Sequence, residues 1–266
     1  MNTIHDIKQP NQTLRRREHV VSIDLTVAPF TEQQESIIAA AVRGESRTVC
    51  FANVHMVVES RHQMELAQAV NRADWVATDG VPLIWALRSL YKIRQDRVAG
   101  MDMMPSLLGR AAEENLPVFF YGSTPDILKR CVEVCSQRFP RLTIAGTISP
   151  PFRTLSADEE ETIAKEITNS GAKLVFVALG CPKQELWMAR MRGRIPAVML
   201  GIGAALPLLV GETKRAPLWV RQIGMEWAFR LGQEPQRLLK RYVTTNSAYL
   251  WYWGVQFFKH KKTTLS

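Results

Sequence analysis

The strongest constraint on the fold is a regular alternation of short β-type runs with helical patterns. The predicted strands are rich in β-branched and aromatic residues and cover Val20–Leu25, Thr48–Asn53, Trp75–Asp79, Val118–Gly122, Leu142–Ile148, Leu174–Gly180 and Val198–Gly203. The helical patterns between them cover Thr31–Arg43, Met56–Arg72, Pro82–Leu90, Met103–Asn115, Pro125–Phe139, Ala157–Ser170 and Pro182–Arg192. Parallel strands need crossover connections, which helices usually provide. The alternation therefore predicts a largely parallel sheet with helices on both faces.

This prediction places the chain in the α/β class, with a Rossmann-like, doubly wound architecture. After Gly211 the strand pattern ends, and helical patterns with basic and aromatic residues follow; four of the seven tryptophans lie there. We therefore expect a polar N-terminal extension at residues 1–19, an α/β catalytic domain at 20–211 and a helical appendage at 212–266. Ser156 with Glu159 forms a capping box at one helix start.

Most of the positive charge lies in the appendage. The chain has a formal net charge of +9, and residues 212–266 hold ten basic and three acidic residues, a balance of +7. This excess predicts polyanionic partners, which are nucleic acid, anionic lipid or phosphorylated small molecules.

Cysteine usage and terminal composition indicate a reducing compartment. Cys50, Cys131, Cys135 and Cys181 have neither disulfide-framework nor zinc spacing, so we expect free thiols. No signal peptide opens the chain, which predicts a cytosolic protein. The uncharged runs Ile195–Gly211 and Tyr242–Phe258 are interrupted or too short to read as membrane spans.

Ligands of doubly wound sheets bind where strands end, so the candidate site residues follow predicted strands. They are Asn53, His55, Asp79, Gly80, Gly122, Gly180, Lys183, Gln184, Glu185 and Gly203. Asp79 is either a general base or the cap of the helix that begins near Pro82. His55 is either a pocket residue or a hydrogen-bonded structural histidine.

The turn at Gly180 suits a diphosphate, because glycine and Pro182 precede a helix N-terminus. An ordinary strand-to-helix turn explains the same residues. The chain has no Walker A loop and no Gly-x-Gly-x-x-Gly fingerprint, since Leu206 stands at the third glycine after Gly201-Ile-Gly203. A nicotinamide-dependent oxidoreductase is therefore disfavoured.

Several motifs together resemble the WecG/TagA/CpsF family of glycosyltransferases (glycosyltransferase family 26). They are R-V-A-G-M-D from Arg97, G-C-P-K-Q-E-L-W from Gly180, K-R-A-P-L-W from Lys214 and E-W-A-F-R-L-G-Q-E-P-Q-R-L-L-K-R-Y from Glu226. The resemblance implies a UDP-sugar-dependent, inverting, metal-independent transferase without a cofactor. It would move a hexose, namely glucose, N-acetylmannosamine or its uronic acid, to a polyprenyl-diphosphate-linked sugar.

The resemblance also implies residue roles. Asp79 matches the family's proposed base, and Arg97 matches a basic position that stabilises the leaving diphosphate. Asn53 and Gln184 match pocket positions whose amides could bind the sugar or the nucleotide. Arg97 has an alternative role as a surface ion-pair partner of Asp96 or Asp102.

In the appendage, the resemblance suggests that basic residues cover the site and hold the acceptor's diphosphate. These residues are Arg230, Arg237, Lys240 and Arg241. A solvated basic face is the alternative; the interleaved aromatics favour a segment at the anionic inner face of the plasma membrane. The protein would thus be cytoplasmic and peripheral, in bacterial cell-surface polysaccharide biosynthesis.

Two points keep the assignment open. Many family members carry an aromatic-Asp pair where this chain has Leu206-Pro207, so the donor sugar, acceptor, linkage and pathway stay undetermined. The competing function is a non-catalytic, basic Rossmann-like protein that binds a nucleotide or nucleic acid. No nucleic-acid motif supports it, so we expect no nucleic-acid partner. The sequence leaves a homo-oligomer open.

Overall fold

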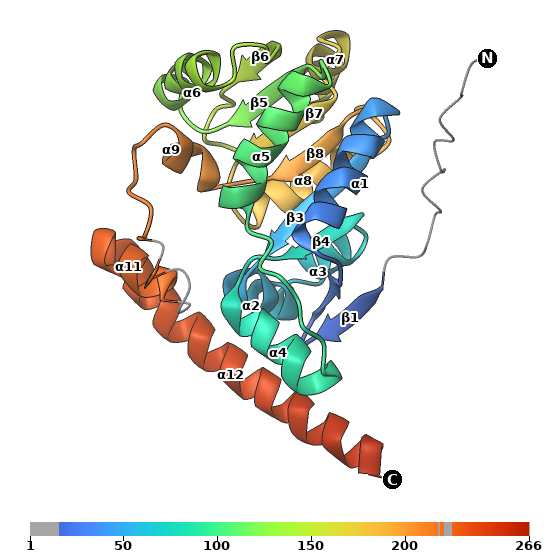
Figure 1. Ribbon diagram of the computed structural model, residues 1–266, viewed down its shortest axis with the longest axis vertical. Helices are drawn as coiled ribbons and strands as arrows, with labels where there is room; N and C mark the ends of the chain where they lie inside the picture. The colour runs from blue at the N-terminus through green and yellow to red at the C-terminus, as the bar shows by residue number, and fades with distance from the viewer. Residues whose placement is uncertain (1–15, 218, 221–224, 266) are drawn as a thin grey trace, which may run out of the picture.

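The centre of the molecule is a six-stranded, all-parallel sheet with the strand order β4-β3-β8-β7-β5-β6. The computed structural model describes residues 16–217, 219–220 and 225–265, with backbone alone at 230, 237, 240, 241 and 263–265. The strands are β3 (Arg47–Ala52), β4 (Trp75–Thr78), β5 (Val118–Gly122), β6 (Ile144–Ile148), β7 (Leu174–Ala178) and β8 (Val198–Gly201). The predicted α/β, Rossmann-like fold is confirmed (Figure 1).

Helices cover both faces of this sheet because the strands are apolar on both sides. One face packs against α1 (Phe30–Val42), α5 (Gly100–Glu113) and α6 (Pro125–Arg138). The other packs against α3 (Met64–Asn71), α7 (Ala157–Asn169) and α8 (Lys183–Met191). Successive strand residues alternate between the two cores, as Phe119 and Phe120 do.

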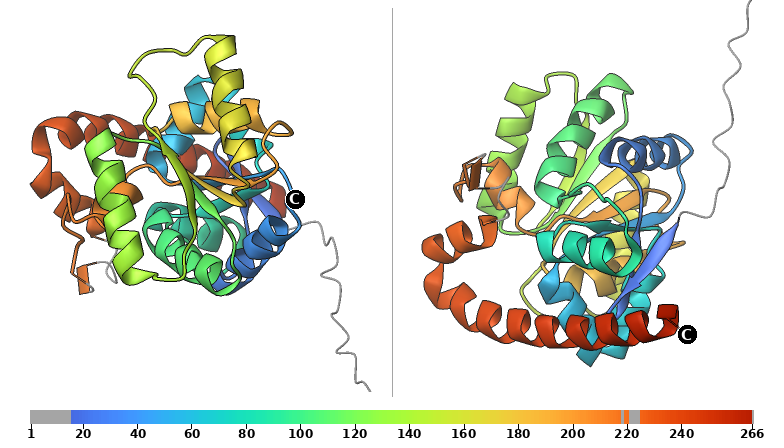
Figure 2. Two further views of the ribbon diagram at one scale, coloured as in Figure 1. Left: turned by 90° about the horizontal axis from the view of Figure 1, so that it is seen from above. Right: turned by 60° about the horizontal axis from the view of Figure 1, so that its bottom comes forward.

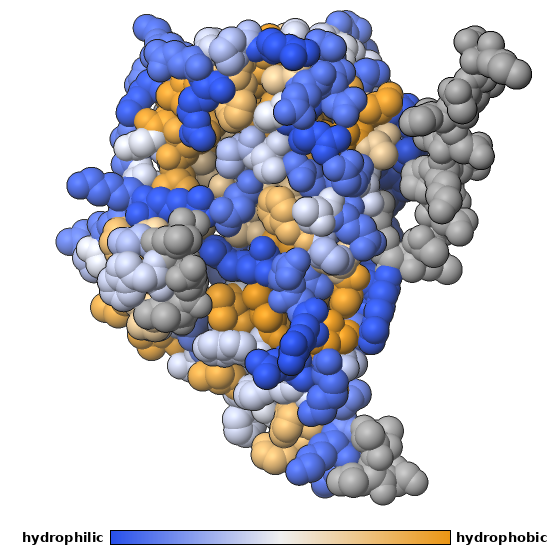
Figure 3. Space-filling view, in the orientation of Figure 1, coloured by the Kyte–Doolittle hydropathy of each residue, from blue (hydrophilic) through white to orange (hydrophobic). Residues whose placement is uncertain are grey.

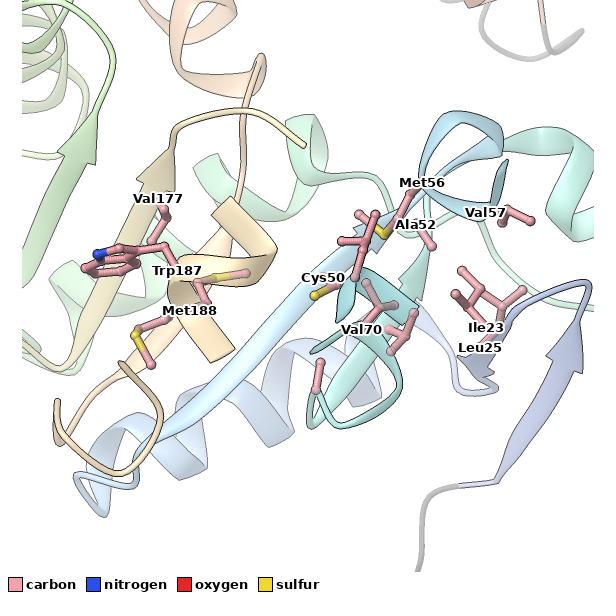
Figure 4. Packing of buried hydrophobic residues seen from close by; sticks show 14 of the residues in the cluster. Ile23, Leu25, Cys50, Ala52, Met56, Val57, Val70, Val177, Trp187 and Met188 are labelled. Carbon is pink, nitrogen blue, oxygen red and sulfur yellow. The ribbon is translucent and has the colours of Figure 1, made fainter. Parts of the chain in front are cut away.

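The core on the α8 side joins the sheet to the N-terminal segment. Figure 4 shows Trp187 and Met188 of α8 near Val177, and Cys50 on β3. Ile23 and Leu25, at the other end of this core, belong to the N-terminal segment. The four cysteines carry free thiols, as predicted.

The first predicted strand is wrong. Val20–Leu25 does not form one strand of the central sheet, because the chain reverses within it. β1 (Arg17–Val20) and β2 (Ile23–Thr26) form an antiparallel hairpin of their own. Val21 has a φ of 61°, the left-handed conformation that this tight turn requires. Part of the expected N-terminal extension, residues 17–19, is therefore strand, and residues 1–15 lie outside the described residues.

The predicted helix Met56–Arg72 is also two helices. α2 (Val54–His62) and α3 are separated by Gln63, whose φ of −120° and ψ of 102° are extended. α2 consequently points its first turn at the carboxyl end of β3, while α3 turns away to pack against α8. The capping box of Ser156 and Glu159 is confirmed at the start of α7.

The chain ends in α9 (Ala205–Leu209), α11 (Glu226–Gln233) and the long α12 (Pro235–Leu265). Figures 1 and 2 show α12 running along the lower edge of the molecule, past α2 and α4 (Val81–Tyr91), to the hairpin. Gln256 of α12 donates to the carbonyl of His19 at 2.8 Å and accepts from the Val21 N–H at 2.9 Å. Among the described helices, none combines the length and apolarity needed to cross a bilayer.

Candidate active site

A cavity of about 720 Å³ lies at the carboxyl ends of β3, β4, β7 and β8. Its floor comes from the sheet and from the first turns of α2 and α4. Residues 212–216, α11 and the first part of α12 line it from the other side. The appendage and the α/β domain therefore share one cavity, at the sheet edge where ligands of this architecture bind.

Asp79 lies in this cavity immediately after β4. Its backbone N–H and that of Gly80 both donate to the carbonyl of Ala52, at 2.9 and 3.1 Å, which fixes the turn after the strand. Helix α4 is capped by Gly80 without a side-chain cap bond, so the helix-cap alternative for Asp79 is wrong. The Asp79 carboxylate is one-fifth exposed and thus accessible from the cavity.

Arg97 holds Asp79 through two contacts. Its Nε donates to the Asp79 carbonyl at 2.9 Å, and its Nη2 donates to Asp79 Oδ1 at 3.2 Å. Nη2 also lies 2.7 Å from Oε2 of Glu226, the first residue of α11. Burial disfavours the charged guanidinium, but the carboxylates of Asp79 and Glu226 outweigh this effect and raise the pKa of Arg97. The cavity thus contains a permanent cation.

The expected alternative partners of Arg97 are engaged elsewhere. Asp102 pairs with Arg215, and the Asp96 carboxylate accepts from the Phe30 N–H at 3.3 Å. The ion pairs of Arg97 are with Asp79 and Glu226, and its side chain is 22% exposed, while the charge of Asp102 also raises its pKa. Within the described ranges, no group of three His, Cys, Asp or Glu side chains is placed to hold a metal ion.

Asn53 and His55 reach the cavity from the start of α2. Asn53 caps this helix, since its Oδ1 accepts from the Met56 N–H at 3.1 Å. The amide nitrogen of Asn53 is not needed for the cap and can donate to a ligand. His55 Nδ1 lies 3.8 Å from Glu59 Oε1, one helical turn along. Gly80 lies against Asn53, and a Cβ there would be 3.3 Å from Asn53 Cα.

Gln184 ties together two loops that line the cavity. Its Oε1 accepts from the Gly180 N–H at 3.1 Å, and its Nε2 donates to the Gly201 carbonyl at 3.0 Å and to Glu185 Oε1 at 2.8 Å. Both amide hydrogens are therefore used within the protein. Gly201 is tightly enclosed, because a Cβ there would lie 2.9 Å from Met188 Cε and 3.0 Å from Gln184 Nε2.

Six of the nine expected substrate-binding residues line the cavity: Asn53, His55, Gly80, Gly180, Gln184 and Gly203. The other three do not. Gly122 instead allows β5 to approach β7, since a Cβ there would lie 2.6 Å from the backbone of Ala178. Lys183 is exposed, and Glu185 is buried beneath the turn, where burial raises the pKa of its carboxyl. Neighbouring Ser123, rather than Gly122, lines the cavity.

The four basic residues expected to hold the acceptor diphosphate have side chains outside the described residues. Their backbones place Arg230 in α11 and Arg237, Lys240 and Arg241 in the first turns of α12. These turns adjoin the cavity, which Tyr242, Thr245 and Asn246 line.

Sequence reasoning missed Glu226 and Tyr242 as cavity residues. Tyr242 packs edge to face on Trp227, with ring centroids 6.1 Å apart. The available signal for Glu226 was an acidic residue beside an aromatic one in a segment that is otherwise basic. At the departure from the family pattern, Leu206 is fully buried in α9, whereas Pro207 lines the cavity. The position at which this chain lacks the carboxylate of the family pattern therefore borders the cavity.

Comparison with known proteins gives the chain a family. The chain is 29% identical over 236 residues to the N-acetylglucosaminyldiphosphoundecaprenol N-acetyl-beta-D-mannosaminyltransferase of Bacillus subtilis (strain 168), covering 88% of this chain and 84% of the relative. The model of the glycosyl transferase WecG/TagA/CpsF family matches residues 18–263, which include both the sheet and the appendage that enclose the cavity. The chain therefore belongs to the WecG/TagA/CpsF family of glycosyltransferases.

Proposed function

We propose that this chain transfers a hexose from a UDP-sugar to a polyprenyl-diphosphate-linked sugar, with inversion and without a metal. The observation that carries the proposal is the shared cavity of Asp79, Arg97 and the Gly180 turn. A carboxylate can act as the general base for the acceptor hydroxyl, and a cation and a helix N-terminus can stabilise the leaving diphosphate.

In the proposed reaction, Asp79 removes the proton from the acceptor hydroxyl. The acceptor oxygen forms its bond to the anomeric carbon on the face opposite the diphosphate. The bond between that carbon and the diphosphate oxygen breaks, and UDP leaves with the electron pair. The carboxyl of Asp79 holds the proton at the end of the step.

Stabilisation of the leaving diphosphate is the proposed role of Arg97 and the N-terminal end of α8. The described contacts of Arg97 use Nε and Nη2 and leave the two hydrogens of Nη1 for a ligand. A guanidinium can neutralise developing phosphate charge, which supports the metal-independent proposal. The N-terminus of α8 carries the positive end of the helix dipole.

The acceptor class rests on the Bacillus subtilis relative, whose name gives an undecaprenol-diphosphate-linked N-acetylglucosamine as acceptor and N-acetylmannosamine as the transferred sugar. We propose an acceptor of the same chemical class for this chain. The donor sugars that we propose are glucose, N-acetylmannosamine and its uronic acid. Pro207 lines the cavity at the departure from the family pattern, so the choice among them is left to experiment.

A lipid-linked acceptor requires access to a membrane surface. Two exposed regions of this protein have side chains suited to contact with such a surface. Along α12, large apolar side chains are exposed at Leu239, Val243, Leu250, Trp251 and Phe258. Figure 3 shows apolar residues along the lower edge of the molecule, where α12 runs. Beside α12, a shallow depression on and after α4 is lined by Trp85, Arg88, Ser89, Lys92 and Arg94. Exposed tryptophan with cations suits an anionic interface.

The decisive experiment is a UDP-release assay with a synthetic prenyl-diphosphate sugar and each of the three UDP-sugars. We expect acceptor-dependent release with one donor, unchanged by EDTA. Binding of NAD or nucleic acid without any UDP binding would overturn the proposal in favour of a non-transferase. Loss of activity in EDTA that added Mg²⁺ restores would overturn metal independence alone.

A further inference from the structure

Glu226 connects the appendage to the catalytic pair, although sequence reasoning gave it no role. It is the first residue of α11, and its side chain is only 11% exposed. Its Oε2 lies 2.7 Å from Arg97 Nη2. A carboxylate buried at this distance from a guanidinium forms a charged contact that bulk water screens weakly.

Nη2 of Arg97 therefore contacts two carboxylates, those of Asp79 and Glu226. Nη2 is 2.7 Å from Glu226 Oε2 and 3.2 Å from Asp79 Oδ1, so the two carboxylates compete for this nitrogen, while Nε keeps its bond to the Asp79 carbonyl. Arginine bound closely to a carboxylate stabilises its charged form and makes it a weaker base. Sharing Arg97 with Glu226 reduces this effect, and the negative charge of Glu226 also favours a proton on Asp79.

We propose that Glu226 is a positioning residue that shares Nη2 of Arg97 with Asp79 and, through its negative charge, keeps Asp79 basic enough to deprotonate the acceptor. This inference deepens the proposed function and rests on it. Because Glu226 belongs to α11, the strength of the base depends on the docking of the appendage. The base would reach full strength only when α11 lies over the cavity.

The other charged groups near this pair come from several elements. Asp102 of α5 pairs with Arg215 and also acts on Arg97, while His55 of α2 pairs with Glu59. These groups remain in place when Glu226 is replaced. A change in the pH dependence on replacing Glu226 therefore reports on the Glu226 charge itself.

The test compares Glu226→Gln with the wild-type protein, because glutamine keeps the shape and an oxygen acceptor for Arg97 while removing the charge. We expect the acid limb of the kcat/KM profile to move to lower pH by about one pH unit. Above that limb, kcat should fall roughly tenfold, since Asp79 becomes a weaker base. Glu226→Asp should restore the wild-type profile in part.

Glu160→Gln is the matched control. It removes a similarly enclosed carboxylate, 14% exposed, which pairs with Arg190 of α8 rather than with Arg97 and does not line the cavity. We expect this variant to leave the acid limb in place. A uniform loss of rate in Glu226→Gln with an unmoved acid limb would show a merely structural role and overturn the inference.

A direct titration separates this inference from the proposed function. The Asp79 carboxyl can be followed by NMR in protein with isotope-labelled aspartate, its signal assigned by comparison with Asp79→Asn. We expect its titration to move to lower pH in Glu226→Gln, whether or not turnover is detected. An unmoved titration would overturn the inference, whereas absent turnover with every donor would overturn the proposed function alone.

Discussion

The hydroxyl of Tyr249 donates a hydrogen bond of 3.0 Å to the carbonyl of Pro82. This bond ties the middle of α12 to the first turn of α4, three residues after Asp79. Tyr249 is 2% exposed and packs in the same core as the α8 face of the sheet. The C-terminal helix is therefore anchored next to the turn that carries Asp79.

Tyr249→Phe should lower the free energy of unfolding by about 1 kcal/mol, because it removes one buried hydrogen bond and keeps the ring. Urea denaturation followed by tryptophan fluorescence measures this change. Tyr252→Phe is the control, since the Tyr252 hydroxyl lies 3.4 Å from His62 Nε2 in an exposed contact. Equal losses in both variants would contradict a special anchoring role for Tyr249.

Asp79→Asn should reduce turnover by about 10²- to 10⁴-fold, the usual contribution of a general base. UDP affinity should be retained, because asparagine keeps an oxygen for the Arg97 contact. UDP-release kinetics and isothermal titration calorimetry check the two parts. Asp96→Asn, which changes an exposed neighbouring carboxylate, should keep the wild-type rate. A near-normal rate in Asp79→Asn would remove this residue from the mechanism.

Gly122→Ala should destabilise the fold by roughly 3 kcal/mol. Gly122 has a φ of +108°, and the new Cβ would lie 2.6 Å from the Ala178 backbone, so strain and a clash between β5 and β7 add together. Gly171→Ala isolates the strain, because Gly171 has a φ of +73° with no atom within 4 Å of the added Cβ. That control should lose only about 1 kcal/mol in chemical denaturation.

Glu185→Gln should raise stability at alkaline pH. Burial raises the pKa of the Glu185 carboxyl above its usual 4.5, so the folded state holds this proton more tightly than the unfolded chain does. The stabilising effect of the bound proton is complete below about pH 4.5 and is lost as the pH rises through the folded-state pKa. The advantage of Glu185→Gln should consequently grow as the pH rises above about 4.5 and level off above the folded-state pKa, as measured by urea denaturation. An advantage that does not change with pH above 4.5 would contradict a raised pKa of this buried carboxyl.

Replacing Trp85, Arg88 and Lys92 together by alanine should weaken binding to anionic phosphatidylglycerol vesicles by at least about thirtyfold, since each of the two cations contributes about 1 kcal/mol near the surface. Co-sedimentation with the vesicles measures this loss, and neutral phosphatidylcholine vesicles should show little binding of either protein. Phe152→Ala is the control, since Phe152 is 82% exposed on the loop between β6 and α7. Undiminished binding of the triple variant would exclude α4 from the membrane face.

Most of the sheet was predictable because each parallel strand is a short apolar run bounded by a helix pattern. The hairpin was not, because it depends on Val21 adopting a left-handed conformation that β-branched residues rarely take. The break between α2 and α3 at Gln63 was equally unpredictable, since no glycine or proline occurs at this position. Both features are imposed by packing rather than by local residue preference.

The candidate site was predictable where residues follow strands, as Asn53, Asp79 and Gly180 do. The ion pair of Arg97 with Glu226 was not predictable, because it joins segments that only the folded chain brings together. Gly122 was wrongly expected to bind substrate. Its position after a strand indicated a ligand contact, whereas its lack of a side chain serves the close approach of two strands.

The contacts of Gln256 with His19 and Val21 also bear on how the protein is made. The side chain that closes the turn of the hairpin lies 235 residues after Val21, so it is synthesised much later than the hairpin itself. The hairpin and α12 can reach their joint arrangement only after residue 256 has left the ribosome. A nascent chain stalled earlier would carry a formed parallel sheet with its active-site cover still undocked.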